Sequence, residues 1–115
     1  MWIFRNDAML SIVQDRDNKD RLLVRARKDG DIEAVFPDAD TFTDAGADYR
    51  FRAWIPREEV AKAVYESVMN IDYGNFKDSI NKLDKDRKHA YMGVWTAMYN
   101  LQEKDRYERL QGFYR

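Results

Sequence analysis

Residues 48–56, DYRFRAWIP, alternate between two kinds of side chain, and this alternation decides the fold. One set of positions is Tyr49, Phe51, Ala53 and Ile55, and the other is Arg50, Arg52 and Trp54. Successive side chains of a β-strand point to opposite faces of the sheet. The stretch therefore predicts a strand with one face in a hydrophobic core, and with two arginines and a tryptophan on the other face.

A second alternating segment, RLLVRAR at residues 21–27, has the same character. Its predicted inward positions are Leu22, Val24 and Ala26, and its outward positions are Arg21, Leu23, Arg25 and Arg27. Two extended runs precede it, at residues 2–5 and 9–14, and the polar segment 15–20 connects the second run to it. Two runs that flank a polar loop are typical of a β-hairpin. We therefore expect antiparallel strands in the first half of the chain.

The second half of the chain is predicted to be helical. Pro56 stands before a helix over residues 57–70, whose stripe is Val60, Val64, Val68 and Ile71; a short helix is predicted within 72–83. Asp84 or Asp86 is expected to cap a last helix, with the stripe Tyr91, Val94, Trp95, Met98 and Leu101. Trp95 and Met98 are expected to be buried, and the chain is expected to fray after Gly112.

Between the strands, Asp29-Gly30-Asp31 is expected to cap a short helix that Pro37 ends, and residues 38–48 are expected to form a loop. Because the strands come early and the helices late, the predicted fold class is α+β. We expect an antiparallel sheet of three to four strands with helices packed on one face. Residues 1–115 are expected to form a single domain, with strands mainly in 2–55 and helices mainly in 57–110.

The composition excludes several functions. Twenty basic residues against 21 acidic residues give a formal net charge of −1, which argues against a protein that coats DNA and against an acidic mimic of nucleic acid. The chain has no cysteine, so disulfides, thiolate catalysis and cysteine-based metal sites are excluded. No apolar run approaches the ~18–20 residues of a membrane span. We expect a cytoplasmic protein with no cofactor.

The outward positions of the two alternating segments are the main candidate site: Arg25, Arg27, Arg50, Arg52 and Trp54. Three interpretations remain open. In the first, the arginines form ion pairs within the chain and cover the sheet with the aliphatic part of their side chains. In the second, the face binds another protein or a second copy of the chain, since Arg and Trp are enriched in binding hot spots. In the third, it binds RNA, with the arginines on phosphates and the tryptophan stacked on a base. The RNA interpretation lacks the paired aromatics of RNA-recognition sheets.

Other candidate motifs are incomplete. Asp15 and Asp17 have the spacing of calcium ligands, but Lys19 and Asp20 stand where an EF-hand loop needs an oxygen ligand and a glycine. His89 is the only histidine, and no nucleophile or orienting carboxylate accompanies it. We therefore expect no metal site and no enzymatic activity.

The segment IDYGNFKDSI, residues 71–80, is the second candidate binding site. It combines potential capping residues with a glycine and two aromatic side chains. The structural interpretation is a helix junction packed on the core. The functional alternative is a recognition loop that exposes Tyr73, Asn75 and Lys77.

Four segments resemble a group of small, single-domain bacterial proteins of unknown function. They are LSIVQDRDNKDRLLVRARKDGDIEAVFP, GADYRFRA, IDYGNFKDSI and AYMGVW. The resemblance covers most of the chain and implies a single intact domain, without catalytic residues to carry over. The sequence thus predicts a small non-enzymatic binding or regulatory protein. The alternatives are an inhibitor carried by a phage or mobile element against a host defence complex, and an RNA-associated protein.

Overall fold

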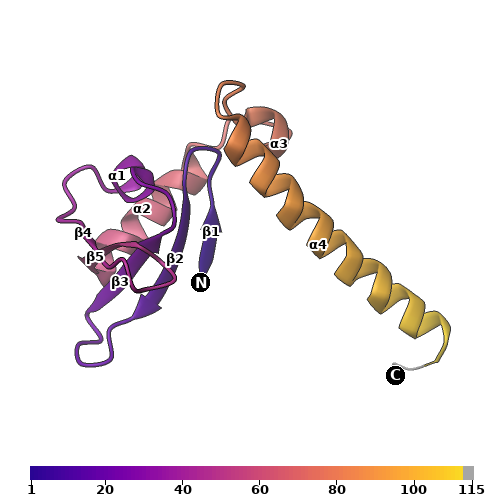
Figure 1. The fold of residues 1–115 in the computed structure, drawn as a ribbon, viewed down its shortest axis with the longest axis horizontal. Helices are drawn as coiled ribbons and strands as arrows, with labels where there is room; N and C mark the ends of the chain where they lie inside the picture. The colour runs from indigo at the N-terminus through magenta and orange to yellow at the C-terminus, as the bar shows by residue number, and fades with distance from the viewer. Residues whose placement is uncertain (113–115) are drawn as a thin grey trace. The chain divides into compact units, whose positions relative to one another are not determined.

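The computed structural model describes residues 1–112, which form nine helices and strands (Figure 1). The strands are β1 (Trp2–Phe4), β2 (Met9–Gln14), β3 (Arg21–Ala26), β4 (Phe42–Thr43) and β5 (Phe51–Pro56). The helices are α1 (Asp31–Val35), α2 (Arg57–Met69), α3 (Phe76–Ser79) and α4 (Lys85–Leu110). The chain divides into two compact units, Met1–Gly74 and Asn75–Arg115, and each is described by itself below.

The first unit is built on an antiparallel sheet with the strand order β1-β2-β3-β5-β4. The predicted α+β class is confirmed. The sheet of the described residues has five strands, because Phe42 and Thr43, inside the expected loop 38–48, pair with β5 as the edge strand β4. Two residues are too few to show an alternating pattern, so this strand leaves no signal in the sequence.

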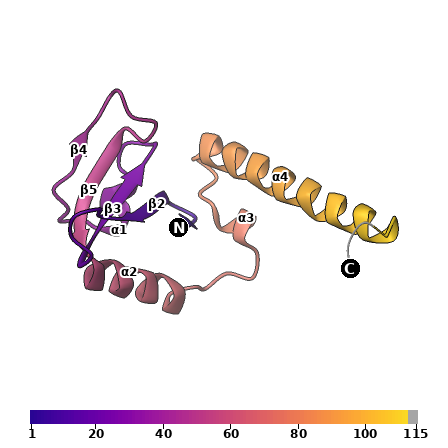
Figure 2. The same ribbon diagram turned by 90° about the horizontal axis from the view of Figure 1, so that it is seen from below.

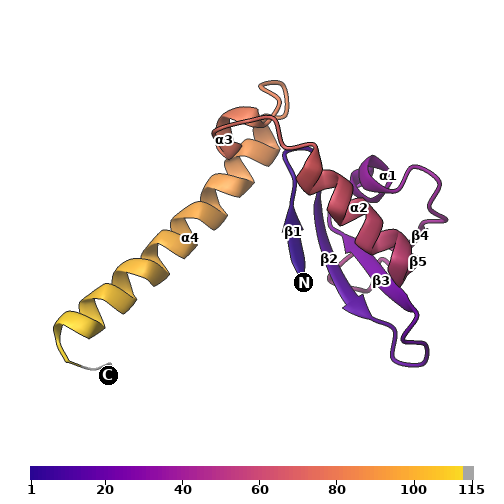
Figure 3. The ribbon, with the colours of Figure 1, turned by 180° about the vertical axis from the view of Figure 1, so that it is seen from behind.

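Helices α1 and α2 cover one face of this sheet. Figure 2 shows α2 on this face from below, and Figure 3 shows α2 in front of the sheet from behind. The hydrophobic cluster between them and the sheet consists of Leu10, Ile12, Val24, Ala26, Ile32, Ala53, Ile55 and Val60. The strands β2, β3 and β5 each contribute alternate residues to it, as the alternation predicts. Val24, Ala26 and Ala53 have no exposed surface at all.

Two expectations for the first unit are wrong in part. Tyr49 is buried, but its ring lies against the guanidinium groups of Arg25 and Arg27 instead of joining the hydrophobic cluster. It precedes the first residue of β5, so strand alternation does not fix its direction. In α2, the stripe is buried only at its start: Val60 is buried, whereas Val68 and Ile71 are more than half exposed.

Helix α1 begins at its expected cap segment, Asp29-Gly30-Asp31. Gly30 is the N-cap residue, with a φ of +93° that favours glycine, and no side chain caps the helix. The buried carboxylate of Asp31 instead accepts a hydrogen bond from the backbone N–H of Met9, at 2.9 Å. This bond ties the start of α1 to the start of β2.

The second unit contains α3 and α4, and each begins at a side-chain cap. The Asn75 side chain accepts from the N–H of Asp78 at 3.1 Å, and the Asp84 side chain accepts from the N–H of Arg87 at 3.2 Å. Asp84 is thus the cap of the last helix. The rings of Phe76 and Tyr91 are stacked, with their centres 5.9 Å apart, and join α3 to the first turns of α4.

The expectation that Trp95 and Met98 are buried is wrong: 49% of Trp95 and 58% of Met98 is exposed. The reason is a difference in length between the two helices of this unit. At 1.5 Å per residue, the four residues of α3 span ~6 Å, whereas the 26 residues of α4 span ~39 Å. Helix α3 can therefore cover only the beginning of the stripe on α4.

The expected fraying after Gly112 lies outside the described residues. Among the helices of residues 1–112, none combines the length and the apolar character that crossing a membrane requires.

Candidate functional site

The sheet face opposite α1 and α2, called the open face below, carries the outward positions of the strands. Residues that stand opposite one another in neighbouring antiparallel strands point to the same side of the sheet. The strand register therefore groups the side chains of this face into rows. The central row crosses all five strands and consists of Trp2, Ser11, Arg25, Arg52 and Phe42.

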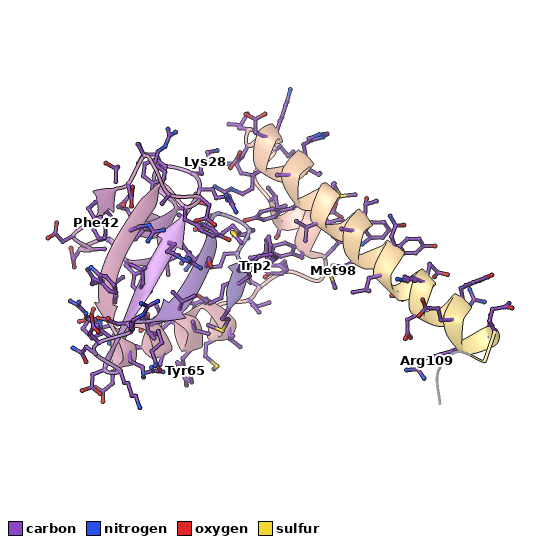
Figure 4. All side chains as sticks on the ribbon, turned by 60° about the horizontal axis from the view of Figure 1, so that its bottom comes forward. Trp2, Lys28, Phe42, Tyr65, Met98 and Arg109 are labelled. Carbon is purple, nitrogen blue, oxygen red and sulfur yellow. The ribbon has the colours of Figure 1, made fainter. Side chains whose placement is uncertain are left out.

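Next to the central row lies a row of three apolar side chains, Val13, Leu23 and Trp54, called the apolar row below. Trp54 is 41% exposed and Val13 is 36% exposed. Trp2 and Phe42, at the two ends of the central row, are also exposed and are labelled in Figure 4. The exposed apolar side chains thus belong to β1, β2, β5 and β4, on one side of one sheet.

The apolar row borders an ion pair at the end of the sheet. Arg21 forms a salt bridge with the buried carboxylate of Asp15, and its guanidinium group lies 4.2 Å from the centre of the Trp54 ring. The N–H of Asp17 donates to Asp15 at 2.9 Å, and this bond together with Arg21 holds the pKa of the Asp15 carboxyl below its usual value. The loop 15–20 is therefore held by its own polar contacts.

Three arginines gather around Tyr49. The guanidinium groups of Arg25 and Arg27 lie 4.5 Å and 4.1 Å from the centre of its ring. The Nε of Arg52 donates to the Tyr49 carbonyl oxygen at 3.0 Å, and its Nη2 lies 4.0 Å from the carboxylate of Asp48. Tyr49 is thus buried by cations that lie against its ring, an arrangement that the ring's negative face favours.

The centre of the open face is polar and closed. Arg25 donates through Nη2 to the hydroxyl of Ser11 at 2.7 Å, and Ser11 itself is 1% exposed. The Nε of Arg25 is buried without a hydrogen-bond partner among the described residues, next to the Tyr49 ring. Arg27 donates to the Asp48 carbonyl oxygen at 2.8 Å. Of the predicted site residues, Arg25, Arg27 and Arg52 are therefore engaged within the chain.

The remaining residues of the predicted face differ from these three. Arg50 is exposed. Trp54 belongs to the apolar row, next to Val13 and Leu23. Sequence reasoning missed Val13, Trp2 and Phe42 as members of this face. The alternation of residues 9–14 could have indicated Val13, but Phe42 becomes part of the face only through the pairing of β4.

The second candidate segment is divided between the two units. Tyr73 is half-buried in the first unit, whereas Asn75 and Lys77 belong to the second. Asn75 caps α3, as described above, and the ammonium group of Lys77 lies 5.1 Å from the centre of the Trp95 ring. Asn75 and Lys77 therefore have identifiable structural contacts in their own unit.

The only histidine and the carboxylates are the candidates for a metal site. His89 is exposed on α4. Within residues 1–112, no three His, Asp or Glu side chains lie close enough together to hold a metal ion. Of the two candidate sites, the open face is the one in which side chains from several strands lie together on one surface.

Comparisons of this chain with models of protein families, with curated proteins and with solved structures found no match.

Proposed function

We propose that this chain is a small non-enzymatic binding protein that contacts another protein through the open face. The observation that carries the proposal is the apolar row, Val13, Leu23 and Trp54, which lies on the face opposite the helices of its unit and is partly exposed. With Trp2 and Phe42, it places two tryptophans and a phenylalanine at the surface of one sheet. Exposed apolar patches of this kind mark interaction sites in soluble proteins.

The aromatic part of this surface is held in place before a partner arrives. Arg21 lies over the Trp54 ring and is itself held by Asp15. A side chain that is already ordered loses less conformational freedom when it is buried in an interface, so more of the contact energy appears as affinity. Trp and Arg are also the residues most often found in binding hot spots.

The charges around the apolar row indicate the chemistry of the partner. The partly exposed Arg21, whose guanidinium group lies over the Trp54 ring, places positive charge at the rim of the face. A protein surface with an apolar centre and carboxylates around it would match this distribution, and the opposite charges would steer its approach. Inhibition of a host defence complex would be one biological role of such a contact.

Binding of RNA through the same face has less support from these contacts. Arg25, Arg27 and Arg52 already donate to Ser11, Asp48 and Tyr49, so phosphates would have to replace these bonds. A protein ligand that buries the apolar row leaves them intact.

The test is a comparison of partners captured by the wild-type chain and by two variants. Val13→Glu places a carboxylate in the apolar row, and Tyr65→Glu makes the same kind of change at an exposed position of α2, away from the open face. We expect to capture a protein that binds the wild type and Tyr65→Glu but not Val13→Glu. After this partner has been purified, it should show the same difference in binding between the two variants. Circular dichroism of both variants would control for folding.

Two outcomes would contradict the proposal. One is a set of partners that Val13→Glu leaves unchanged. The other is a ligand that nuclease removes and whose affinity falls steeply with salt, which would indicate that the face binds RNA.

A further inference from the structure

We propose that the edge of β1, together with a groove beside α2, binds an extended peptide segment of another protein as an added β-strand. This site goes beyond the proposed function, because it uses the edge of the sheet and the side on which α2 lies, whereas the apolar row lies on the opposite side. All of its residues belong to the first unit, Met1–Gly74. Figure 3 shows β1 as the outermost strand of the sheet.

The hydrogen bonds between β1 and β2 show which backbone groups of β1 are left for a partner. The Met1 amino group donates to the Ile12 carbonyl oxygen, and the Ile12 N–H donates to the Met1 carbonyl oxygen, both at 2.8 Å. In an antiparallel pair, opposite residues alternate between those that exchange both bonds and those that exchange none. Trp2 and Ser11, the next pair, therefore exchange none, and the N–H and C=O of Trp2 point away from β2.

No strand of the described residues covers these two groups. β1 is the last strand on its side of the sheet, and the backbone of Trp2 has no hydrogen-bond partner within residues 1–112. Proline and charged side chains, which commonly prevent an edge strand from pairing, are absent from Trp2–Phe4. An extended peptide matches such an edge, because its own backbone supplies the acceptor and the donor that these groups need.

A groove beside the edge can take a side chain of the added strand. It has a volume of about 450 Å³ and is lined by Met1 and Leu22 from the sheet side and by residues of α2. Met1 points to this side because it stands opposite the buried Ile12. The residues that line the groove from α2 are Arg57, Val60, Ala61, Val64 and Tyr65. Because all but Arg57 are apolar or aromatic, the groove favours an apolar side chain.

Helix α2 runs alongside β1, so its exposed apolar residues follow the edge. At one end Met1 and Tyr65 line the same groove, and at the other end Arg5 donates through Nη1 to the Ser67 hydroxyl at 3.1 Å. Tyr65 and Val68 stand one helical turn apart on α2, and they are 65% and 58% exposed (Tyr65 and Trp2 are labelled in Figure 4). An added strand therefore has apolar surface beside it on the helix side.

The register of β1 indicates which side chains of the ligand use this surface. The peptide residue opposite Trp2 points to the open face, as Trp2 does. Its two neighbours stand opposite Met1 and Ile3 and point to the side of α2, because successive side chains of a strand alternate. We therefore expect a ligand with apolar side chains at two positions that are two residues apart.

A phage-displayed library of random linear peptides supplies the probe, and a selected peptide is then titrated by fluorescence polarisation. Tyr65→Glu should weaken its binding about tenfold or more, because a carboxylate would lose water beside an apolar side chain. Val13→Glu, on the open face, is the control and should bind as the wild type does. A wild-type chain that selects no peptide would overturn the proposal, and so would a peptide that Val13→Glu loses and Tyr65→Glu keeps.

Two variants of Trp2 isolate the contribution of the backbone. Trp2→Pro removes the N–H that points away from β2 and keeps the bonds to β2, whereas Trp2→Ala removes the same indole ring and keeps the N–H. We expect Trp2→Pro to bind the peptide about tenfold or more weakly than Trp2→Ala does. Equal affinities would overturn strand addition. Circular dichroism of both variants controls for folding.

N-methylated peptides test the same pairing with the wild-type chain, so the result does not depend on the folding of a variant. Each backbone amide of the selected peptide is methylated in turn, which removes one donor at a time. Methylation of the amide that pairs with the Trp2 carbonyl oxygen should weaken binding about tenfold or more. A peptide that tolerates methylation at every position would overturn the proposal.

Sedimentation equilibrium distinguishes a peptide ligand from a second copy of the chain at the same edge. We expect the wild type without peptide to sediment at 13.7 kDa. A dimer that Trp2→Pro abolishes and Trp2→Ala keeps would show that β1 of a second copy occupies the edge, and it would overturn the peptide as the ligand. Since Val13→Glu probes the open face separately, failure of this proposal can be distinguished from failure of the proposed function.

Discussion

The guanidinium group of Arg21 lies 4.2 Å from the centre of the Trp54 ring, while the same side chain forms a salt bridge with Asp15. One arginine thus joins the loop that precedes β3 to the apolar row of the open face. Because the cation is held on one side by a buried carboxylate, the position of the exposed Trp54 ring is determined in part by residues of β3 and of the loop before it.

A double-mutant cycle measures the contact between Arg21 and Trp54. We expect the two alanine substitutions to be coupled by about 0.5–1 kcal/mol in the free energy of unfolding, which is the range of cation–π pairs at exposed sites. Urea unfolding of the wild type, both single variants and the double variant gives this number. Strictly additive effects would show that the ring and the guanidinium group do not interact.

Arg50 and Arg52 should respond differently to the same substitution. Arg52→Ala removes the hydrogen bond to the Tyr49 carbonyl oxygen and the ion pair with Asp48, so we expect a loss of about 1–3 kcal/mol of stability. Arg50 is exposed, and Arg50→Ala should stay within about 0.5 kcal/mol of the wild type. Chemical denaturation measures both. Equal effects of the two substitutions would contradict the internal role of Arg52.

Stability should depend on pH through Asp15. The N–H of Asp17 and the guanidinium group of Arg21 lower the pKa of Asp15 in the folded chain. A carboxyl with a depressed folded pKa stabilises the fold above its unfolded pKa of about 3.9, and this contribution is lost as the pH falls through the folded pKa. The wild type should therefore be more stable than Asp15→Asn at pH 7.

This difference should shrink as the pH falls below about 4, the unfolded pKa of an aspartate. Urea unfolding of the wild type and Asp15→Asn at a series of pH values is the measurement. A difference that stays constant from neutral to acidic pH would show that the Asp15 carboxylate is not the group responsible.

The junction between α3 and α4 should depend on Ile80, which is 2% exposed. Ile80→Ala removes buried apolar surface, and we expect it to lower stability by about 2–5 kcal/mol. Leu83→Ala, three residues later, is the control, because Leu83 is 89% exposed and its truncation should stay within about 0.5 kcal/mol. Thermal unfolding followed by circular dichroism compares them; equal melting temperatures for the two variants would contradict this assignment.

The core face of the sheet could be predicted from sequence because the period of a strand is two. Phe51, Ala53 and Ile55 alternate as expected along β5. Tyr49, which precedes the strand, is buried as expected, but its ring lies against Arg25 and Arg27 and not in the hydrophobic cluster. The ion pairs could not be predicted. Which of 21 acidic residues pairs with Arg52 depends on the turn that precedes β5, and sequence spacing does not specify its geometry.

The exposure of Trp95 and Met98 on α4 could not be predicted from the sequence either. A helical pattern of apolar residues shows that one side of the helix needs a partner, but it does not say whether that partner is in the same chain. Trp95 and Met98 have the pattern of core residues and are exposed. These side chains are exposed because α3 is too short to cover them. The length of α3 depends on the residues at which the helix begins and ends within the segment 71–80, and the apolar pattern does not specify these.

Ser11, at the centre of the open face, has a consequence for how this surface can change during evolution. Its hydroxyl is covered by Arg25, and its small side chain leaves the room that the arginine stem occupies. A larger residue at position 11 would displace Arg25 from Tyr49, so we expect these three positions to covary in related sequences. Val13 lies in the neighbouring row, so a change at this position leaves the contacts of Ser11, Arg25 and Tyr49 in place.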